Sequence, residues 1–121
     1  MGRVEKSIEI KAPPEKVWEL LAVDRFPEWD EGTRKNVKST EYASEVSTPE
    51  DKYRVGVIAR QTENRGKTLD LEITESLENE KITYRSNSWS ADVTFILEPL
   101  EERTNLTYAM DYELPGGGDS R

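Results

Sequence analysis

Residues 8–29 constrain the fold more than any other segment of this chain. Ile8 and Ile10 alternate with charged residues, which is the pattern of a half-buried β-strand. Pro13 and Pro14 follow closely, and a strand ends there because proline has no N–H to donate to a neighbouring strand. We therefore expect a strand that gives way at once to a different element.

A short helix is predicted after the first proline. Pro14 suits the first turn of a helix, where an N–H has no partner in any case, and apolar residues follow at helical spacing. Pro27 prevents this helix from continuing, so a second short helical segment or turn is expected to begin near Phe26. The apolar stripe should face a core, and it consists of Val17, Trp18, Leu20 and Leu21.

Three short motifs stand in this segment: Ile10-x-Ala12-Pro13, Val17-Trp18 and Phe26-Pro27-x-Trp29. Together they resemble the opening of the START-like superfamily, also called SRPBCC, and within it the polyketide cyclase/dehydrase-like and coenzyme-Q-binding proteins. The resemblance implies an α+β helix-grip fold of the START/Bet v 1 type, with short N-terminal helices and a curved antiparallel sheet that grips a long C-terminal helix. It also implies an apolar cavity between the sheet and that helix.

The rest of the chain reads as consecutive strands. A strand is expected over 34–42, an acidic loop over 43–51, and turns at 64–66, 78–80 and 101–103. Short turns between strands predict an antiparallel meander with one wetted face. The residues expected on the apolar faces are Tyr53, Val55, Val57 and Ala59; Leu69, Leu71 and Ile73; Ile82, Tyr84, Ser86 and Ser88; Val93, Phe95 and Leu97; and Leu106, Tyr108, Met110, Tyr112 and Leu114.

The length fits one START-like domain over residues 1–121, in which 115–121 form a glycine-rich tail. The resemblance implies a long helix after this point, and the sequence does not continue into one. We therefore expect either a truncated chain or a partner over the apolar face of the sheet, because an uncovered face of several strands exceeds what a monomer usually exposes. A homodimer through that face is the simplest arrangement.

Composition excludes several kinds of chemistry. The 121 residues contain no histidine and no cysteine, so Ser-His-Asp and Cys-His nucleophilic systems are impossible and the commonest ligands for zinc are missing. No calcium-loop motif is present. We expect no metal and no cofactor.

Charge and hydropathy bound the partners. The formal net charge of −8 argues against nucleic acid as a partner. No stretch approaches the roughly 20 apolar residues of a transmembrane helix. Because the first residues lack the apolar run of a signal peptide and cysteine is absent, the cytoplasm is the expected location.

Any acid or base would have to be a carboxylate, a lysine or a tyrosine in an apolar cavity. Tyr84, Tyr108 and Tyr112 are the best placed, since each falls on the apolar face of its strand. The alternative is that their hydroxyls bond to the backbone or to water, as in most buried tyrosines. Asp92 and Asp111 have the opposite parity and should face solvent.

The candidate ligand-binding residues combine aromatic, apolar and small polar side chains. Trp18 is expected in the core, whereas the segment that holds Trp29 borders the cavity mouth in the superfamily. Ser86 and Ser88 either orient a ligand or mark a fraying sheet edge, and the parity of Trp89 is not fixed. The full candidate lining is Trp29, Tyr53, Leu71, Tyr84, Ser86, Phe95, Tyr108 and Tyr112.

Three functions remain open at this point. The first is binding or transport of a hydrophobic small molecule, such as a lipid, quinone or polyketide, in the apolar cavity. The second is an enzyme of the cyclase or dehydratase type that moves one proton without a metal. The third is a protein-interaction module that uses the exposed sheet face. No motif separates them, and no catalytic residue is assigned.

Overall fold

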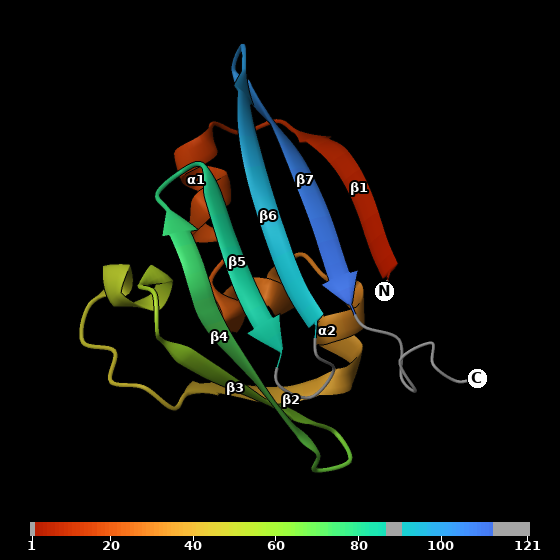
Figure 1. Ribbon diagram of the computed structural model, residues 1–121, viewed down its shortest axis with the longest axis vertical. Coiled ribbons are helices and arrows are strands. Elements are labelled where there is room, and N and C mark those ends of the chain that lie inside the picture. The colour runs from red at the N-terminus through yellow and green to blue at the C-terminus, as the bar shows by residue number, and fades with distance from the viewer. Residues whose placement is uncertain (1, 87–90, 113–121) are drawn as a thin grey trace.

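The computed structural model describes residues 2–86 and 91–112, so Ser88, Trp89, Leu114 and the tail 115–121 lie outside the described residues. Within these ranges seven strands form one antiparallel sheet in the order β1-β7-β6-β5-β4-β3-β2 (Figure 1). The strands are β1 Gly2–Ile10, β2 Val37–Tyr42, β3 Ile58–Glu63, β4 Thr68–Leu77, β5 Lys81–Ser86, β6 Ala91–Leu100 and β7 Arg103–Tyr112. The predicted meander is confirmed, and β1 joins it at the edge beside β7.

Short helices lie on one face of the sheet, which we call the inner face (Figure 1). They are α1 Pro14–Glu19, the 3₁₀ helix η1 Val23–Glu28, and α2 Glu31–Asn36. As predicted, Pro14 stands in the first turn of α1, and Val17 and Trp18 are buried. Pro27 lies within η1, which starts at Val23 rather than near Phe26. Of the helices that the described ranges contain, none is long enough and apolar enough to span a membrane.

The strand predicted over 34–42 starts too early, because residues 34–36 belong to α2 and β2 begins at Val37. Local hydrogen bonds favour the helix. The hydroxyl of Thr33 donates to the carboxylate of Asp30, and the side-chain amide of Asn36 donates to the carbonyl oxygen of Gly32. These contacts within one turn replace the ladder that a strand would need.

The strand predicted from Tyr53 is also wrong over its first five residues. Tyr53 ends a second 3₁₀ helix, η2 Pro49–Tyr53, and β3 begins only at Ile58. Thr48 and Asp51 form a reciprocal capping box that nucleates η2, so the expected loop over 43–51 ends in this helix. Val55 is consequently exposed rather than on an apolar strand face.

The predicted turns and apolar faces of the later strands are confirmed. Gly66, Asn79 and Glu102 each have positive φ at a hairpin turn. Cross-strand register places Ile73 opposite Tyr84, and Phe95 opposite Tyr108, on the inner face. The core that these strands form with the helices is a single cluster of buried residues: Val17, Trp18, Leu21, Val23, Phe26, Val57, Ala59, Leu71, Ile73, Ile82, Tyr84, Phe95, Leu97 and Leu106.

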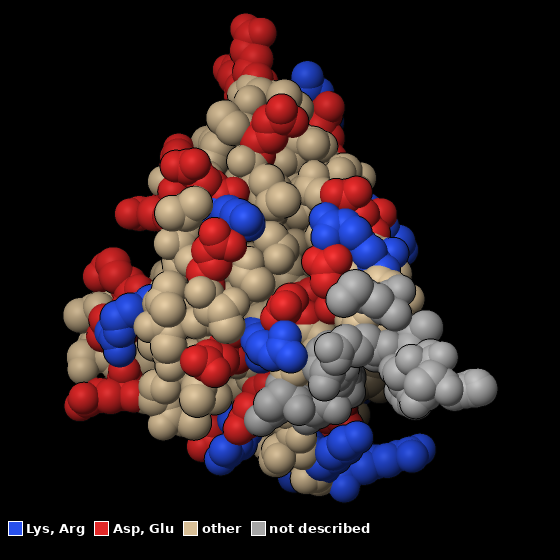
Figure 2. All heavy atoms as spheres, viewed as in Figure 1, with Lys and Arg blue, Asp and Glu red and all other residues tan. Residues whose placement is uncertain are grey.

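The outer face of the sheet is polar, with acidic and basic side chains interspersed (Figure 2). Asp92 and Asp111 lie on it, as their parity predicts. Each carries an arginine partner, because Arg3 bonds Asp111 at 2.7 Å and Arg85 bonds Asp92 at 3.1 Å. This face is therefore exposed to solvent, and the apolar side chains of the sheet lie mainly on the inner face.

The edge strand β1 departs from the prediction of a half-buried strand. Ile8 faces inward opposite Leu106, yet 58% of it is exposed, and Val4 opposite Met110 is 41% exposed. The helix α1 packs on β6 and β7, so the described residues leave the inner side of β1 largely uncovered. The long helix that the resemblance implied is not among the helices of the described ranges.

Candidate functional site

The predicted lining residues separate into a buried group and a more exposed group. Leu71, Tyr84, Ser86 and Phe95 are buried, and Phe95 is only 2% exposed. The rings of Tyr84 and Phe95 both pack edge-on against Phe26 of η1. These four side chains therefore lie in the protein interior.

Tyr84 uses its hydroxyl inside the protein. The side chain is 1% exposed, and its hydroxyl donates a hydrogen bond of 2.5 Å to the carbonyl oxygen of Leu21. Burial raises the pKa of Tyr84 well above its ordinary value. The phenol stays protonated, and its proton is already committed to the backbone.

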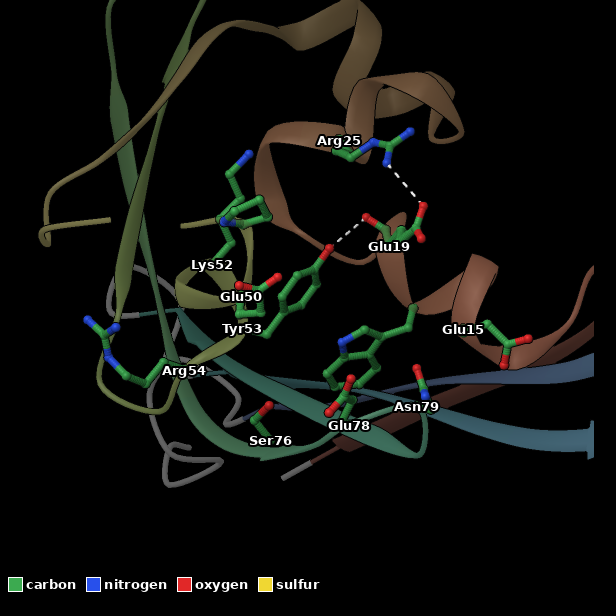
Figure 3. Close-up of a pocket in the computed structure, with 12 residues that line it drawn as sticks. Glu15, Glu19, Arg25, Glu50, Lys52, Tyr53, Arg54, Ser76, Glu78 and Asn79 are labelled. Atoms are coloured by element: carbon green, nitrogen blue, oxygen red, sulfur yellow. Dashed lines mark hydrogen bonds and ion pairs between the residues drawn. The ribbon is translucent and has the colours of Figure 1, made fainter. Parts of the chain in front are cut away.

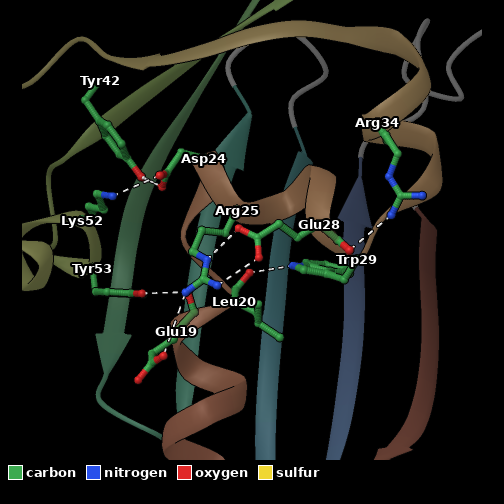
Figure 4. Close-up of polar contacts among 10 residues, drawn as sticks. All are labelled: Glu19, Leu20, Asp24, Arg25, Glu28, Trp29, Arg34, Tyr42, Lys52 and Tyr53. Carbon is green, nitrogen blue, oxygen red and sulfur yellow. Dashed lines mark hydrogen bonds and ion pairs between the residues drawn. The ribbon is translucent and has the colours of Figure 1, made fainter.

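Trp29, Tyr108 and Tyr112 form the second group, in which Trp29 is exposed and the two tyrosines are half-buried. Trp29 is 38% exposed, and its ring packs edge-on against Phe26 at 5.3 Å and against Phe95 at 5.9 Å between ring centroids. Its indole N–H donates to the carbonyl oxygen of Leu20 at 2.6 Å (Figure 4). Trp29 is thus fixed in position with part of its ring open to solvent.

Tyr108 continues this surface on β7. It is half-buried, and its ring centroid lies 5.6 Å from that of Phe95. Burial, and to a smaller extent the charge of Asp30, raise the pKa of Tyr108. At neutral pH its hydroxyl is therefore a hydrogen-bond donor and not a base.

We define the inner strip as Val4, Ile8, Trp29, Tyr108 and Met110. Cross-strand register brings Val4 beside Met110, and Ile8 lies on the same face of β1. Tyr112 lies at the end of the same face of β7, opposite Ala91 on β6. The sequence prediction missed Val4 and Met110 as site residues, although Val4 and Ile8 share one parity in β1.

Ser86 combines complete burial with an unbonded hydroxyl. Its side chain lies between Leu71 of β4 and Ala91 of β6, and its oxygen has no hydrogen-bond partner among the described residues. An unpaired buried hydroxyl costs about 1–3 kcal/mol. Ser86 therefore lies in the protein interior and is not part of the solvent-exposed surface of the inner strip.

Tyr53 lies apart from the rest of the predicted lining, in a separate pocket of about 570 Å³ (Figure 3). Its ring stacks on Trp18 with 5.3 Å between centroids, and its hydroxyl donates to the carbonyl oxygen of Glu19 at 2.9 Å. Its phenol pKa is raised, chiefly by burial. The pocket was not predicted, because residues 43–51 were expected to form a loop and Tyr53 to start a strand, whereas Pro49–Tyr53 form η2.

A polar network joins η1 to β2 and η2 beside this pocket (Figure 4). Asp24 accepts hydrogen bonds from Tyr42 at 2.7 Å and from Lys52 at 3.0 Å. Burial opposes the charge on Asp24, but the bonds from Tyr42 and Lys52 outweigh it and the pKa of Asp24 is lowered. Such contacts between distant residues carry no signal in the sequence.

Residues 2–86 and 91–112 contain no group of three or more acidic side chains arranged to hold a metal ion. The inner strip offers aromatic and aliphatic contacts with the Tyr108 phenol as a donor, and strand register places the exposed Lys6 directly opposite Tyr108 on the same face.

Comparison with known proteins identifies the family. The model of the family described as polyketide cyclase / dehydrase and lipid transport matches residues 1–120. The chain belongs to this family. No curated protein sequence matches the chain.

Solved structures agree on the fold. A protein of Mesorhizobium loti is 23% identical with a TM-score of 0.73, and the match covers 94% of this chain and 79% of that one. Major latex-like protein 151 of Panax ginseng is 18% identical with a TM-score of 0.66, covering 93% and 78%. The Aha1 dimer from Colwellia psychrerythraea is 21% identical with a TM-score of 0.64, covering 94% and 78%. The helix-grip fold of the START-like superfamily is thereby confirmed.

Proposed function

We propose that this protein binds an apolar small molecule of the lipid, quinone or polyketide type on the inner strip. The observation that carries the proposal is the exposure of Ile8 and Val4 on the inner face of β1, on the same side of the sheet as the fixed and partly open Trp29, which packs on Phe95. The family description, which includes lipid transport, supports the same class of ligand.

The energetics favour binding through contact area. Burial of an exposed aliphatic side chain contributes about 1.5–3 kcal/mol, and the inner strip offers several side chains at once. Tyr108 supplies a hydroxyl donor at the centre of the strip, which suits a ligand with one carbonyl or ether oxygen. The combination of apolar walls and a few polar groups is typical of small-molecule sites.

The test compares two isoleucines on opposite faces of the sheet. Ile8 belongs to the inner strip, and Ile96 is 37% exposed on the outer face. Binding of decylubiquinone and of palmitate is followed by quenching of tryptophan fluorescence. We expect Ile8→Ser to weaken binding about tenfold, which corresponds to roughly 1.4 kcal/mol, and Ile96→Ser to leave it unchanged. Equal effects of the two variants, or no saturable binding by either probe, would exclude the proposal.

Turnover is tested on the same surface. Tyr108 is the described tyrosine that combines a raised pKa with partial exposure on the strip, so an enzyme of the cyclase type would depend on its phenol as an acid. Tyr108→Phe keeps the ring. If the protein is a carrier, this variant changes affinity a few-fold and no product forms from a bound polyketone. Product formation that Tyr108→Phe abolishes would establish the enzyme instead.

Self-association is a second candidate use of the inner strip. Val4 and Ile8 lie on an edge strand, where exposed apolar residues favour pairing with another chain. The relative from Colwellia psychrerythraea is a dimer. Native mass spectrometry of wild-type protein separates the two uses: retained small-molecule mass favours a carrier, and a ligand-free dimer that Ile8→Ser dissociates favours association. The cytoplasmic location and the single domain over 1–121 stay predictions.

A further inference from the structure

A second site is indicated by the pocket that Trp18 and Tyr53 share (Figure 3). Tyr53 and the inner strip's Trp29 lie on opposite sides of the end of α1 (Figure 4). Its volume is about 570 Å³, which is within the range of pockets that bind drug-sized small molecules. The lining comes from three segments, namely α1 with η1, η2 with the residue after it, and the end of β4 with the turn that follows: Glu15, Trp18, Glu19, Arg25, Pro49, Glu50, Lys52, Tyr53, Arg54, Ser76, Glu78 and Asn79. Three otherwise separate parts of the chain thus meet at one concave surface.

The basic residues of this pocket are already neutralised. Arg25 bonds both carboxylate oxygens of Glu28 at 2.9 Å, Lys52 bonds Asp24 at 3.0 Å, and Arg54 bonds Asp51 at 2.6 Å. Of these three acidic partners none lines the pocket, although Arg25 also lies 3.9 Å from Glu19, which does. The cations are therefore directed into ion pairs at the rim and are poorly placed to attract an anionic ligand.

The acidic residues of the pocket are mostly free. Glu15 on α1, Glu50 on η2 and Glu78 in the β4–β5 turn form no ion pair with any residue in the ranges 2–86 and 91–112, and all three are exposed. They stand on three different elements around one concave surface. The uncompensated charge of the pocket is thus negative, which favours a cation.

The wall between these carboxylates is aromatic and carries a free donor. Trp18 and Tyr53 are stacked with an angle of 26° between their rings, and aromatic faces attract organic cations. Trp18 is only 6% exposed, and its indole N–H makes no hydrogen bond to the described residues, among which Ser86 alone has a buried side-chain polar atom without a partner. The indole nitrogen is therefore accessible to solvent, and its N–H is available to an acceptor in the pocket. Ser76 and Asn79 add further hydrogen-bonding groups.

We infer that this pocket binds a polyhydroxylated amine, that is, an amino sugar. Such a ligand has ammonium groups for the free carboxylates, hydroxyl oxygens that accept from the Trp18 N–H, and a flat C–H face that packs on the partly exposed ring of Tyr53. A purely apolar ligand would leave the carboxylates and the donor without partners. An anionic ligand would meet net negative charge. The inference is independent of ligand binding on the inner strip.

The experiment uses two disaccharides that differ only in charge. The β-1,4-linked glucosamine dimer has two ammonium groups where cellobiose has hydroxyls. Binding is followed by the ¹H–¹⁵N resonance of the Trp18 indole, assigned from its disappearance in Trp18→Phe. We expect the glucosamine dimer to shift this resonance saturably and to bind at least roughly fivefold more tightly than cellobiose.

Matched charge variants decide between a site and general attraction to an acidic protein. Glu50→Gln and Glu78→Gln should each weaken the glucosamine dimer several-fold, whereas Glu72→Gln, which removes the same charge from the outer face of β4, should not. The inference is overturned if the dimer produces no saturable shift, if cellobiose binds equally well, or if Glu72→Gln weakens binding as much as the pocket variants do. All three glutamates are exposed, so each variant is expected to keep the fold.

Discussion

The hydroxyl of Tyr84 donates a hydrogen bond to the carbonyl oxygen of Leu21, and this bond ties β5 to the residues directly after α1. Both residues are fully buried. Tyr84→Phe should therefore lower the free energy of unfolding by about 1–2 kcal/mol, because the Leu21 carbonyl is left without its partner. Urea denaturation followed by circular dichroism measures the change.

The same variant distinguishes a structural tyrosine from a ligand-binding one. Since the Tyr84 hydroxyl is committed to the backbone, decylubiquinone affinity should be the same in Tyr84→Phe and in wild-type protein. A variant of normal stability with reduced affinity would contradict this assignment.

Phe95 is the aromatic centre of the core. Its ring contacts those of Phe26, Trp29, Tyr84 and Tyr108. Phe95→Ala removes all four contacts and should destabilise the protein by about 3–5 kcal/mol, an amount that unfolds many small domains. Thermal unfolding measures it. The neighbouring Ile96→Ala, on the exposed outer face, should cost about 1 kcal/mol or less, and a comparable loss in both would show that the core lies elsewhere.

The strands from β4 to β7 were predictable because two local signals agreed. Apolar residues alternate along Leu69, Leu71 and Ile73, and the turns after β3 and β4 contain Gly66 and Asn79, which are suited to positive φ. The opening of the chain was predictable from the prolines and the apolar stripe around Trp18. The alternation of apolar residues and the residue types of a turn both depend on residues that are close in the sequence, so they can be recognised from the sequence alone.

The elements between residues 30 and 57 were predicted poorly because their structure depends on side-chain hydrogen bonds. The Thr33–Asp30 hydrogen bond favours a helix that runs into the strand predicted over 34–42. The capping box of Thr48 and Asp51 favours a 3₁₀ helix where a loop was predicted over 43–51. The candidate site was predicted in part for a related reason. Parity placed Tyr108 on the inner face, but exposure of Ile8 and the position of Tyr53 depend on which elements cover which strands, and no local pattern encodes that coverage.

Asp24 makes stability depend on pH in the acid range. Burial opposes its charge, but the bonds from Tyr42 and Lys52 hold the net pKa of Asp24 below its ordinary value. A depressed pKa in the folded state stabilises the protein above the unfolded pKa of about 3.9, and this stabilisation is lost as pH falls through the folded pKa. Asp24→Asn should therefore be less stable than wild type at neutral pH, by about 1 kcal/mol.

The difference between Asp24→Asn and wild type should shrink as the carboxylate is protonated. Urea unfolding of both proteins from pH 7 to about pH 2.5 follows it. Convergence of the two stabilities at the acid end is expected. A difference that stays constant over this range would mean that the charge of Asp24 contributes nothing and that only the shape of its side chain matters.

Two like charges face each other on the outer face, since Asp92 of β6 is directly opposite Asp111 of β7. Arg3 bonds both oxygens of Asp111 at 2.7 Å, and Arg85 bonds Asp92 at 3.1 Å, so each acid is compensated from the strand on its other side. Opposed like charges destabilise a strand pair. Arg3→Gln should therefore lower the melting temperature at low salt, because the charge of Asp111 then has no counter-charge on β1 and repels the charge of Asp92.

The loss caused by Arg3→Gln should be largely absent at about 0.5 M NaCl, where the Debye length falls to a few ångströms. Removal of any cation from a chain with net charge −8 adds some repulsion, so Arg65→Gln in the β3–β4 turn is the matched control. Among the described residues Arg65 forms no ion pair, and its replacement should have the smaller effect at low salt. If Arg3→Gln and Arg65→Gln lower the melting temperature equally at low salt, the opposed aspartates do not govern the pairing of β6 and β7, and general charge repulsion accounts for the effect.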